Sequence, residues 1–196
     1  MTLFVKRLKG DRSGAALIEF AFAAPVLILL IFGSIEVGVN LYLRSVLEGA
    51  MQQAGRNSSL ELAQAGQTTI DSLVTNRVKS IMPGASVTFT RKNYTAFSDI
   101  GRPEDFDDLN ANNIYDSTEC FDDENENNTW DADVGKDGLG GANDVVLYTA
   151  LLDYDGLLPD MTGMGAPKFR QITASTTLRN QPFSTQSIRT VKQVCP

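Results

Sequence analysis

The N-terminal part of the chain has the hydrophobic pattern of a membrane-spanning helix. Residues 20–35 contain no charged side chain, and the apolar run continues to residue 43 with Glu36 as its one charge. As an α-helix this run of about 24 residues extends roughly 36 Å, which is enough to cross a hydrocarbon core. Basic residues precede it, so we expect a cytoplasmic N-terminus and an exported remainder. No small-x-small cleavage site follows, so we expect residues 15–43 to stay as an anchor.

Beyond the apolar run the helical spacing continues. Apolar side chains recur at intervals of three and four residues, at Val46, Leu47, Ala50, Met51 and Ala54. This spacing predicts that residues 44–66 extend the helix as a stem outside the membrane. Packing of the same face into a domain core is the alternative, and the two do not exclude each other.

The rest of the chain has the pattern of a small exported domain. Apolar residues at helical intervals predict a second helix over 68–82, which ends before Pro83. Three β-rich runs follow, at 85–92, 143–154 and 169–183. A helix followed by strands predicts an α+β domain over residues 67–196, in which the second helix packs on an antiparallel sheet.

Composition limits the chemistry that this chain can perform. It has 196 residues and no histidine, which excludes Ser-His-Asp and Cys-His catalysis and imidazole-bound zinc. The net charge is −7, and residues 99–155 alone carry 17 acidic residues against Arg102 and Lys136, a local net charge of −15. This charge argues against nucleic acid as a partner. We expect no enzyme, because the remaining carboxylates have the spacing of calcium ligands.

The acidic region contains an imperfect repeat. The segment EDFDDLNANNIYD at 104–116 recurs as ECFDDENENNTWD at 119–131, with eight of 13 positions identical. The first copy follows the ligand order of an EF-hand-type calcium loop, with Asn113 where glycine is usual. Ligands that are all oxygen suit calcium better than a transition metal. The predicted ligands are the side chains of Asp108, Asn110, Asn112, Asp116 and Glu119 and the carbonyl of Ile114.

The second copy departs from this order at its twelfth position, where Val134 stands. We expect Asp133 or a carboxylate of the first copy to complete it. The offset between the copies leaves no room for flanking helices, so we expect two interlocked calcium loops packed on Tyr115 and Trp130, within an insertion at 99–144. A solvated acidic loop with Asn-rich turns is the alternative. The other predicted ligands of the second copy are Asp123, Asn125, Asn127, Thr129 and Asp131.

The two cysteines, Cys120 and Cys195, are few, even in number and far apart. In an exported protein this indicates a disulfide that closes a long loop, which stabilises the fold by roughly 4 kcal/mol in the chain-entropy estimate. Two unpaired thiols are the alternative.

A charged residue at the start of the apolar segment leads to a family resemblance. Glu19 lies at the cytoplasmic edge of the span, where an unpaired carboxylate costs about 2.5 to 3.5 kcal/mol, so it needs a cation. A cut after Gly14 would make Ala15 the amino terminus, with Glu19 and Phe20 as the fifth and sixth residues. The sequence GAALIEF after a short basic leader resembles the class III signal of type IV pilin-like proteins. Residues 13–56 resemble the TadE-like pseudopilins of the tight-adherence (Tad, or Flp) pilus system.

The resemblance implies roles in processing and assembly for this segment. A prepilin peptidase would remove the leader of residues 1–14, and Glu19 would direct that cut and later meet the terminal amine of a neighbouring subunit. An uncleaved anchor, whose Glu19 reaches the membrane interface, is the alternative. Ser34 and Gly38 form a small-xxx-small pair, and Glu36 between them needs a polar partner across a helix interface.

Two function classes follow from the sequence. The first is a minor structural subunit that helps to initiate, prime or cap a pilus for surface adherence. The second is a membrane-anchored, calcium-stabilised adhesin or binding module unrelated to pilus assembly. The resemblance implies other pilins and pseudopilins, a prepilin peptidase, an inner-membrane assembly platform and membrane lipid as partners. It also implies an inner-membrane location with a periplasmic domain, or an extracellular position within a pilus.

Overall fold

The computed structural model describes residues 13–60, 67–156, 169–181 and 189–196 of the chain. The chain forms two compact units, the first made of Met1–Tyr42 with Gly156–Lys168 and the second of Leu43–Asp155 with Phe169–Pro196. The expected leader up to residue 12 and the end of the expected stem at residues 61–66 lie outside the described residues.

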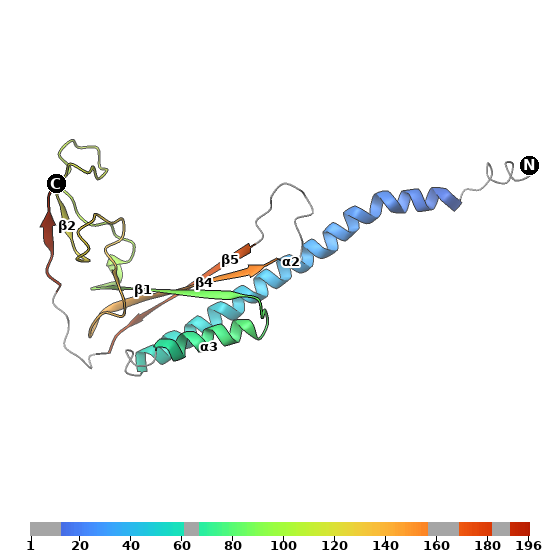
Figure 1. Ribbon diagram of the computed structural model, residues 1–196, viewed down its shortest axis with the longest axis horizontal. Helices are drawn as coiled ribbons and strands as arrows, with labels where there is room; N and C mark the ends of the chain where they lie inside the picture. Colours follow the sequence, from blue (N-terminus) through green and yellow to red (C-terminus); the bar gives the residue numbers. More distant parts are fainter. Residues whose placement is uncertain (1–12, 61–66, 157–168, 182–188) are drawn as a thin grey trace, which may run out of the picture. The chain divides into compact units, whose positions relative to one another are not determined.

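The helix α2, Ser13–Leu60, is continuous and contributes to both units (Figure 1). In the first unit its apolar side chains are exposed, including Phe22 at 79% and Leu29 at 60%. Among the described residues, one helical stretch, Gly14–Arg56, is long and apolar enough to cross a membrane by length and composition. Pro25 lies inside the helix and removes one backbone donor, a loss that membrane helices tolerate.

The second unit is built on a four-stranded sheet. Its strand order is β3-β1-β4-β5, and every pair is antiparallel. The central pair, β1 and β4, runs in unbroken register from Ser86 opposite Asp153 to Tyr94 opposite Val145. The expected antiparallel α+β fold is therefore confirmed (Figure 1). The strands are β1 Ser86–Tyr94, β3 Lys136–Asp137, β4 Val145–Asp155 and β5 Phe169–Arg179.

The core of the second unit contains the C-terminal part of α2. Leu43, Leu47 and Met51 are at most 1% exposed, because positions four apart lie on one helical face. Gly55 continues this face, and a Cβ there would lie 3.2 Å from the side chain of Thr176 in β5. The apolar face predicted for a stem is therefore part of the domain core, which was the alternative left open by the sequence.

The second helix, α3 at Gln67–Lys79, is joined to the sheet by a partly buried polar cluster. Asp71 of α3 accepts hydrogen bonds from Arg91 of β1 and from the hydroxyl of Tyr148 in β4. The Arg91 guanidinium also lies 4.2 Å from the centre of the Tyr148 ring. Burial, and then the contact with Asp71, raises the pKa of Tyr148 well above its ordinary value. Asp71 thus fixes α3 against two neighbouring strands.

The acidic insertion lies between two paired residues of the sheet. The chain leaves β1 at Tyr94 and re-enters β4 at Val145, which are opposite each other. Within the insertion, η1 covers Phe97–Asp99 and β2 covers Phe121–Asp123. β2 pairs with the C-terminal strand β6, Lys192–Val194, in an antiparallel two-stranded sheet.

Candidate functional site

The candidate site is the acidic insertion, whose two repeats fold into two similar loops. Residues 108–119 form loop 1, residues 123–134 form loop 2, and residues 104–134 together form what we call the paired-loop module. Neither loop contains a helix. Each is organised by hydrogen bonds from backbone N–H groups to side-chain oxygens.

The carboxylate of the first residue in each loop accepts hydrogen bonds from two backbone N–H groups of that loop. Asp108 accepts hydrogen bonds from the N–H groups of the fifth and sixth residues of loop 1, at 3.1 and 2.8 Å. Asp123 accepts the same pair of bonds in loop 2, at the same distances. The sixth residues, Asn113 and Asn128, have φ angles of 59° and 60°. Asparagine tolerates this left-handed conformation, so it replaces the usual glycine as the sequence predicted.

Asparagine amides in each loop are directed at the carboxylate of the ninth residue. In loop 1, Asn110 and Asn112 donate from Nδ2 to Oδ2 of Asp116, at 2.7 and 3.1 Å. The equivalent asparagines of loop 2 donate to Asp131. In this structure the amide N–H groups supply the positive dipoles beside these carboxylates.

The remaining predicted ligands lie at the seventh position of each loop. The N–H groups of Ile114 and Thr129 donate to the fifth-position asparagine of their own loops, both at 2.7 Å. Among the described residues no three Asp, Glu, Cys or His side chains gather closely enough to hold a metal ion.

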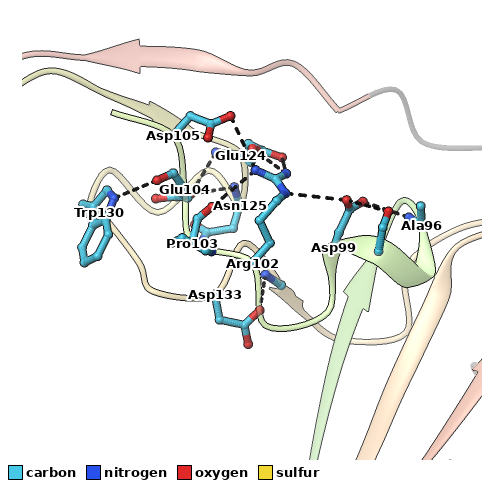
Figure 2. Close-up of polar contacts among 12 residues, drawn as sticks. Ala96, Asp99, Arg102, Pro103, Glu104, Asp105, Glu124, Asn125, Trp130 and Asp133 are labelled. Atoms are coloured by element: carbon cyan, nitrogen blue, oxygen red, sulfur yellow. Dashed lines mark hydrogen bonds and ion pairs between the residues drawn. The ribbon is translucent and has the colours of Figure 1, made fainter. Parts of the chain in front are cut away.

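Each loop is closed by a glutamate from the other repeat. Glu119 is the twelfth residue of loop 1 and also the first residue of the second repeat. Its carboxylate accepts hydrogen bonds from the N–H groups of Leu109 and Asp116, at 2.9 and 3.0 Å. Glu104, the first residue of the first repeat, accepts in loop 2 from the equivalent N–H groups of Glu124 and Asp131, at 2.9 and 3.0 Å. Figure 2 shows Glu104 between Trp130 and Glu124.

Both closing glutamates are fully removed from solvent. Glu104 and Glu119 are each 1% exposed. Burial raises the pKa of the Glu104 carboxyl above its ordinary value, although its backbone N–H donors favour the charged form. A carboxylate is normally buried only with a partner that offsets its desolvation.

Asp133 does not take the twelfth place in loop 2. Its carboxylate accepts instead from Lys92 Nζ at 2.9 Å and from the Tyr94 hydroxyl at 3.1 Å. Burial alone would raise the pKa of Asp133, but these bonds and one from the N–H of Gly135 hold it below its ordinary value. Of the two groups expected to complete loop 2, a carboxylate of the first copy, Glu104, accepts backbone hydrogen bonds in the loop, whereas Asp133 contacts β1.

The two repeats are joined back to back by a short backbone bridge. Phe106 and Phe121, which are equivalent positions, form an antiparallel β-bridge. The N–H of Asp107 donates to the carbonyl of Cys120 at 2.9 Å, and the N–H of Asp122 donates to that of Asp105 at 2.8 Å. The two bonds are equivalent, because Asp107 and Asp122 occupy the same position in their repeats, as do Asp105 and Cys120. The module therefore has approximate two-fold symmetry.

An aromatic cluster lies between the loops. Tyr115 and Trp130, the eighth residues of the loops, stack with ring centres 4.8 Å apart and planes 13° from parallel. Phe106 meets both rings edge to face, and Phe121 meets Tyr115. The Trp130 indole N–H donates to the Glu104 carbonyl at 3.0 Å. The predicted packing of two loops on Tyr115 and Trp130 agrees with this arrangement.

The disulfide expected from the sequence is present. Cys120 and Cys195 are joined, with a separation of 75 residues in the chain. The bond holds β6 beside β2. From β6, Gln193 donates to Asp107 at 3.0 Å, and Lys192 lies 3.3 Å from Asn128 of loop 2.

The predicted processing and assembly residues all lie on α2. Gly14, Ala15, Glu19 and Phe20 are exposed in its first turns. Further along, Ser34 donates to the carbonyl of Ile31 at 2.8 Å, so its hydroxyl is satisfied within the helix. Gly38 is exposed and Glu36 is half-buried. No Cβ added at Gly14 or Gly38 would meet another atom within 4 Å, so both positions are open to a neighbour.

Two contributors to the module were missed by reasoning from the sequence. Glu104 was not named as a ligand candidate, although it aligns with Glu119 at the start of each repeat. Arg102 donates to both oxygens of Glu124 at 2.8 and 2.7 Å, as Figure 2 shows, and no motif signals that pairing. The repeat alignment contained the information needed to find Glu104.

The exposed N-terminal apolar helix, which is long enough to cross a membrane by length and composition, suggests a membrane anchor. Residues 14–56 match the family model described as TadE-like protein, which confirms the resemblance seen in the sequence. The match suggests a protein associated with the Tad pilus system. No curated protein and no solved structure matched the chain.

Proposed function

We propose that the protein is a minor structural subunit, a pseudopilin, of a Tad or Flp pilus, in which it helps to initiate, prime or cap the fibre. The TadE-like match covers the stretch in which one helix passes from the exposed apolar segment into the domain core. Because the same helix carries both parts, lateral packing of the exposed segment would place the domain directly in an assembly. A free adhesin needs an anchor but not this continuity.

The proposed function requires processing between Gly14 and Ala15 by a prepilin peptidase. N-terminal sequencing of the protein extracted from membranes should begin at Ala15. A Gly14→Leu variant should retain the leader, whereas Gly33→Leu, at a position equally open on the same helix, should be cut normally. An intact Met1 together with normal pili would overturn the proposal. An N-terminus beyond residue 43 would instead indicate an ordinary secretory signal.

We also propose that the paired-loop module binds calcium as a structural ion. The support is the oxygen-only donor set in the ligand order of a calcium loop, together with two glutamates that are 1% exposed. Loop 1 would use Asp108, Asn110, Asn112, the Ile114 carbonyl, Asp116 and Glu119. Loop 2 would use Asp123, Asn125, Asn127, the Thr129 carbonyl, Asp131 and Glu104.

The fluorescence of Trp130 provides an intrinsic probe for calcium binding. Trp130 is the single tryptophan, and it lies between the loops with its N–H bonded to Glu104. Calcium titrated into the full-length protein in detergent should change its fluorescence, with affinities of about 0.1 to 1 mM as in exported calcium loops. Magnesium should act much more weakly. Asp105→Asn, outside both loops, is the matched control for Asp108→Asn. No response to calcium by fluorescence or calorimetry would overturn the proposal.

A further inference from the structure

The two loops of the module share one backbone geometry but differ in how their charges are balanced. In loop 2, Glu124 pairs with Arg102 at 2.7 Å and Glu126 pairs with Lys136. In loop 1, no carboxylate pairs with a lysine or arginine within the described part of the chain. Two acids of loop 2 are thus neutralised by cations outside that loop, whereas the loop 1 acids accept hydrogen bonds only from neutral N–H groups within the described part of the chain.

The loops also differ at the positions that face solvent. The second and seventh residues of loop 1 are Leu109 and Ile114, which are 78% and 66% exposed. The equivalent residues of loop 2 are Glu124 and Thr129. Because loop 2 has the same fold without them, these apolar side chains are not required by the loop geometry. Single exposed apolar residues are common, but here both occur on the one loop whose acids have no cationic partner among the described residues.

We propose that the tip of loop 1, formed by Leu109 and Ile114 between the acids Asp108 and Asp116, docks on a protein partner with a basic, apolar-lined surface. Charge complementarity selects this occupant. A net charge of −15 over residues 99–155 repels an anionic membrane and attracts a surface that presents lysine or arginine. The two apolar side chains would then be buried against an apolar centre surrounded by the pairing charges.

This docking surface does not depend on the pilus role. One calcium ion in each loop would change the net charge of residues 99–155 from −15 to −11, because each ion carries two positive charges, and this charge still favours a basic partner. It requires only that loop 1 be folded and accessible. The proposal would stand if the protein were an anchored adhesin, and it would fail without affecting the processing test.

The test uses the full-length protein in neutral detergent and a fluorescent amphipathic peptide of leucine and lysine as the probe. The variant Leu109→Glu/Ile114→Thr gives loop 1 the residues that loop 2 already carries, so folding is preserved. We expect its affinity for the peptide to fall about tenfold or more, because burying the two side chains drives the contact. The added glutamate would strengthen a purely electrostatic contact, so the sign of the change separates the two causes. Leu73→Glu, at another exposed leucine, should leave binding unchanged.

Several outcomes would overturn the proposal. Equal or tighter binding by the double variant would mean that charge alone attracts the peptide. Equal binding of a leucine and glutamate peptide would remove the requirement for a basic partner. Binding of vesicles of anionic phosphatidylglycerol that depends on Leu109 and Ile114 would make a membrane the occupant.

A photo-crosslinking amino acid at position 109 in living cells provides an independent measurement. It should join loop 1 to a protein through a segment that contains basic and apolar residues. The same group at position 129, the loop 2 equivalent of Ile114, should not. A cross-link from both positions, or from 109 to an acidic segment, would contradict the assignment.

Discussion

Glu104 and Glu119 occupy the same position in the two repeats, and each closes the loop formed by the other repeat. Their carboxylates accept equivalent backbone N–H bonds, at 2.9 and 3.0 Å in both loops. Neither repeat can therefore complete its own loop. Each loop depends on a residue of the other repeat, so removing either glutamate should disturb the loop that lies across the pseudo-two-fold axis.

The exchange of glutamates predicts a crossed pattern of amide protection. Glu104→Ala should expose the amides of Glu124 and Asp131 in loop 2 to hydrogen exchange, while loop 1 stays protected. Glu119→Ala should do the reverse, at Leu109 and Asp116. Each substitution leaves buried N–H groups without an acceptor, at a cost of about 1 to 3 kcal/mol per group.

Hydrogen exchange on the full-length protein measures this pattern, and Asp105→Ala is its control. The Asp105 side chain is 80% exposed and closes neither loop. Loss of protection in both loops after either glutamate substitution would show that the loops open together, and it would contradict the crossed pattern.

Much of the fold could be predicted from the sequence because its elements have clear periodicity. The expected β-rich run at 143–154 is β4 at Val145–Asp155, since its residues alternate between the two faces of the sheet. The expected helix at 68–82 is α3, which ends at Lys79, before the turn toward Pro83. Strand order could not be predicted, because it depends on long-range pairings such as Tyr94 with Val145.

The candidate site was only partly predictable for the same physical reason. Ligand order within a loop is a local pattern, so the proposed ligands from Asp108 onward were read from their spacing. The residue that closes loop 2 comes from the other repeat, and spacing within one loop does not reveal it. Asp133 was a reasonable candidate by position, but Lys92 and Tyr94 from β1 hold its carboxylate.

The disulfide predicts a measurable effect of reduction. Cys195→Ser should lower the free energy of unfolding by about 4 kcal/mol in the chain-entropy estimate, because Cys120 and Cys195 are 75 residues apart. The three-residue strand β6 should also lose amide protection, since so short a pairing is weak alone. Dithiothreitol should reproduce both effects in the wild type and change nothing in the variant. Full protection of β6 after reduction would show that hydrogen bonds alone suffice.

The polar cluster at α3 predicts unequal losses of stability. Tyr148→Phe removes one donor to Asp71 and leaves Arg91 in place, so we expect a loss of about 1 kcal/mol. Asp71→Ala leaves the Arg91 charge and the Tyr148 hydroxyl without their acceptor, and should cost about 3 kcal/mol. Urea denaturation measures both, with Asp153→Asn as a control. Equal losses would mean that Arg91 contributes nothing through Asp71.

The proposed pilus role predicts a separation of insertion from assembly at Glu19. Glu19→Ala should still insert in the membrane, because removing a charge favours the span. It should nevertheless fail to co-purify with other pilus components, since the terminal amine of a neighbour would lose its partner. Glu36→Ala should show a milder loss. Normal co-purification of the Glu19 variant would refute the pairing while leaving the anchor intact.

Removal of calcium should destabilise the domain. Free calcium at about 2 mM on a site of about 0.1 mM affinity stabilises the folded state by about 1.8 kcal/mol per site, through RT ln(1 + [L]/Kd). With two sites, EGTA should lower the melting temperature by several degrees, and calcium should restore it much better than magnesium.

Two sets of variants test whether this shift arises in the loops. Asp108→Ala/Asp123→Ala should lose most of the response, because both first-position carboxylates are removed. Glu104→Ala should reduce the response of loop 2 although it lies outside that loop in the sequence, whereas Asp133→Ala should keep it, since Asp133 bonds to Lys92. The disulfide can mask the loss by holding β2 to β6, so each melt is repeated under reducing conditions. Identical melting with calcium and with EGTA in both redox states would leave the module as a pair of acidic loops held by amide and backbone hydrogen bonds alone.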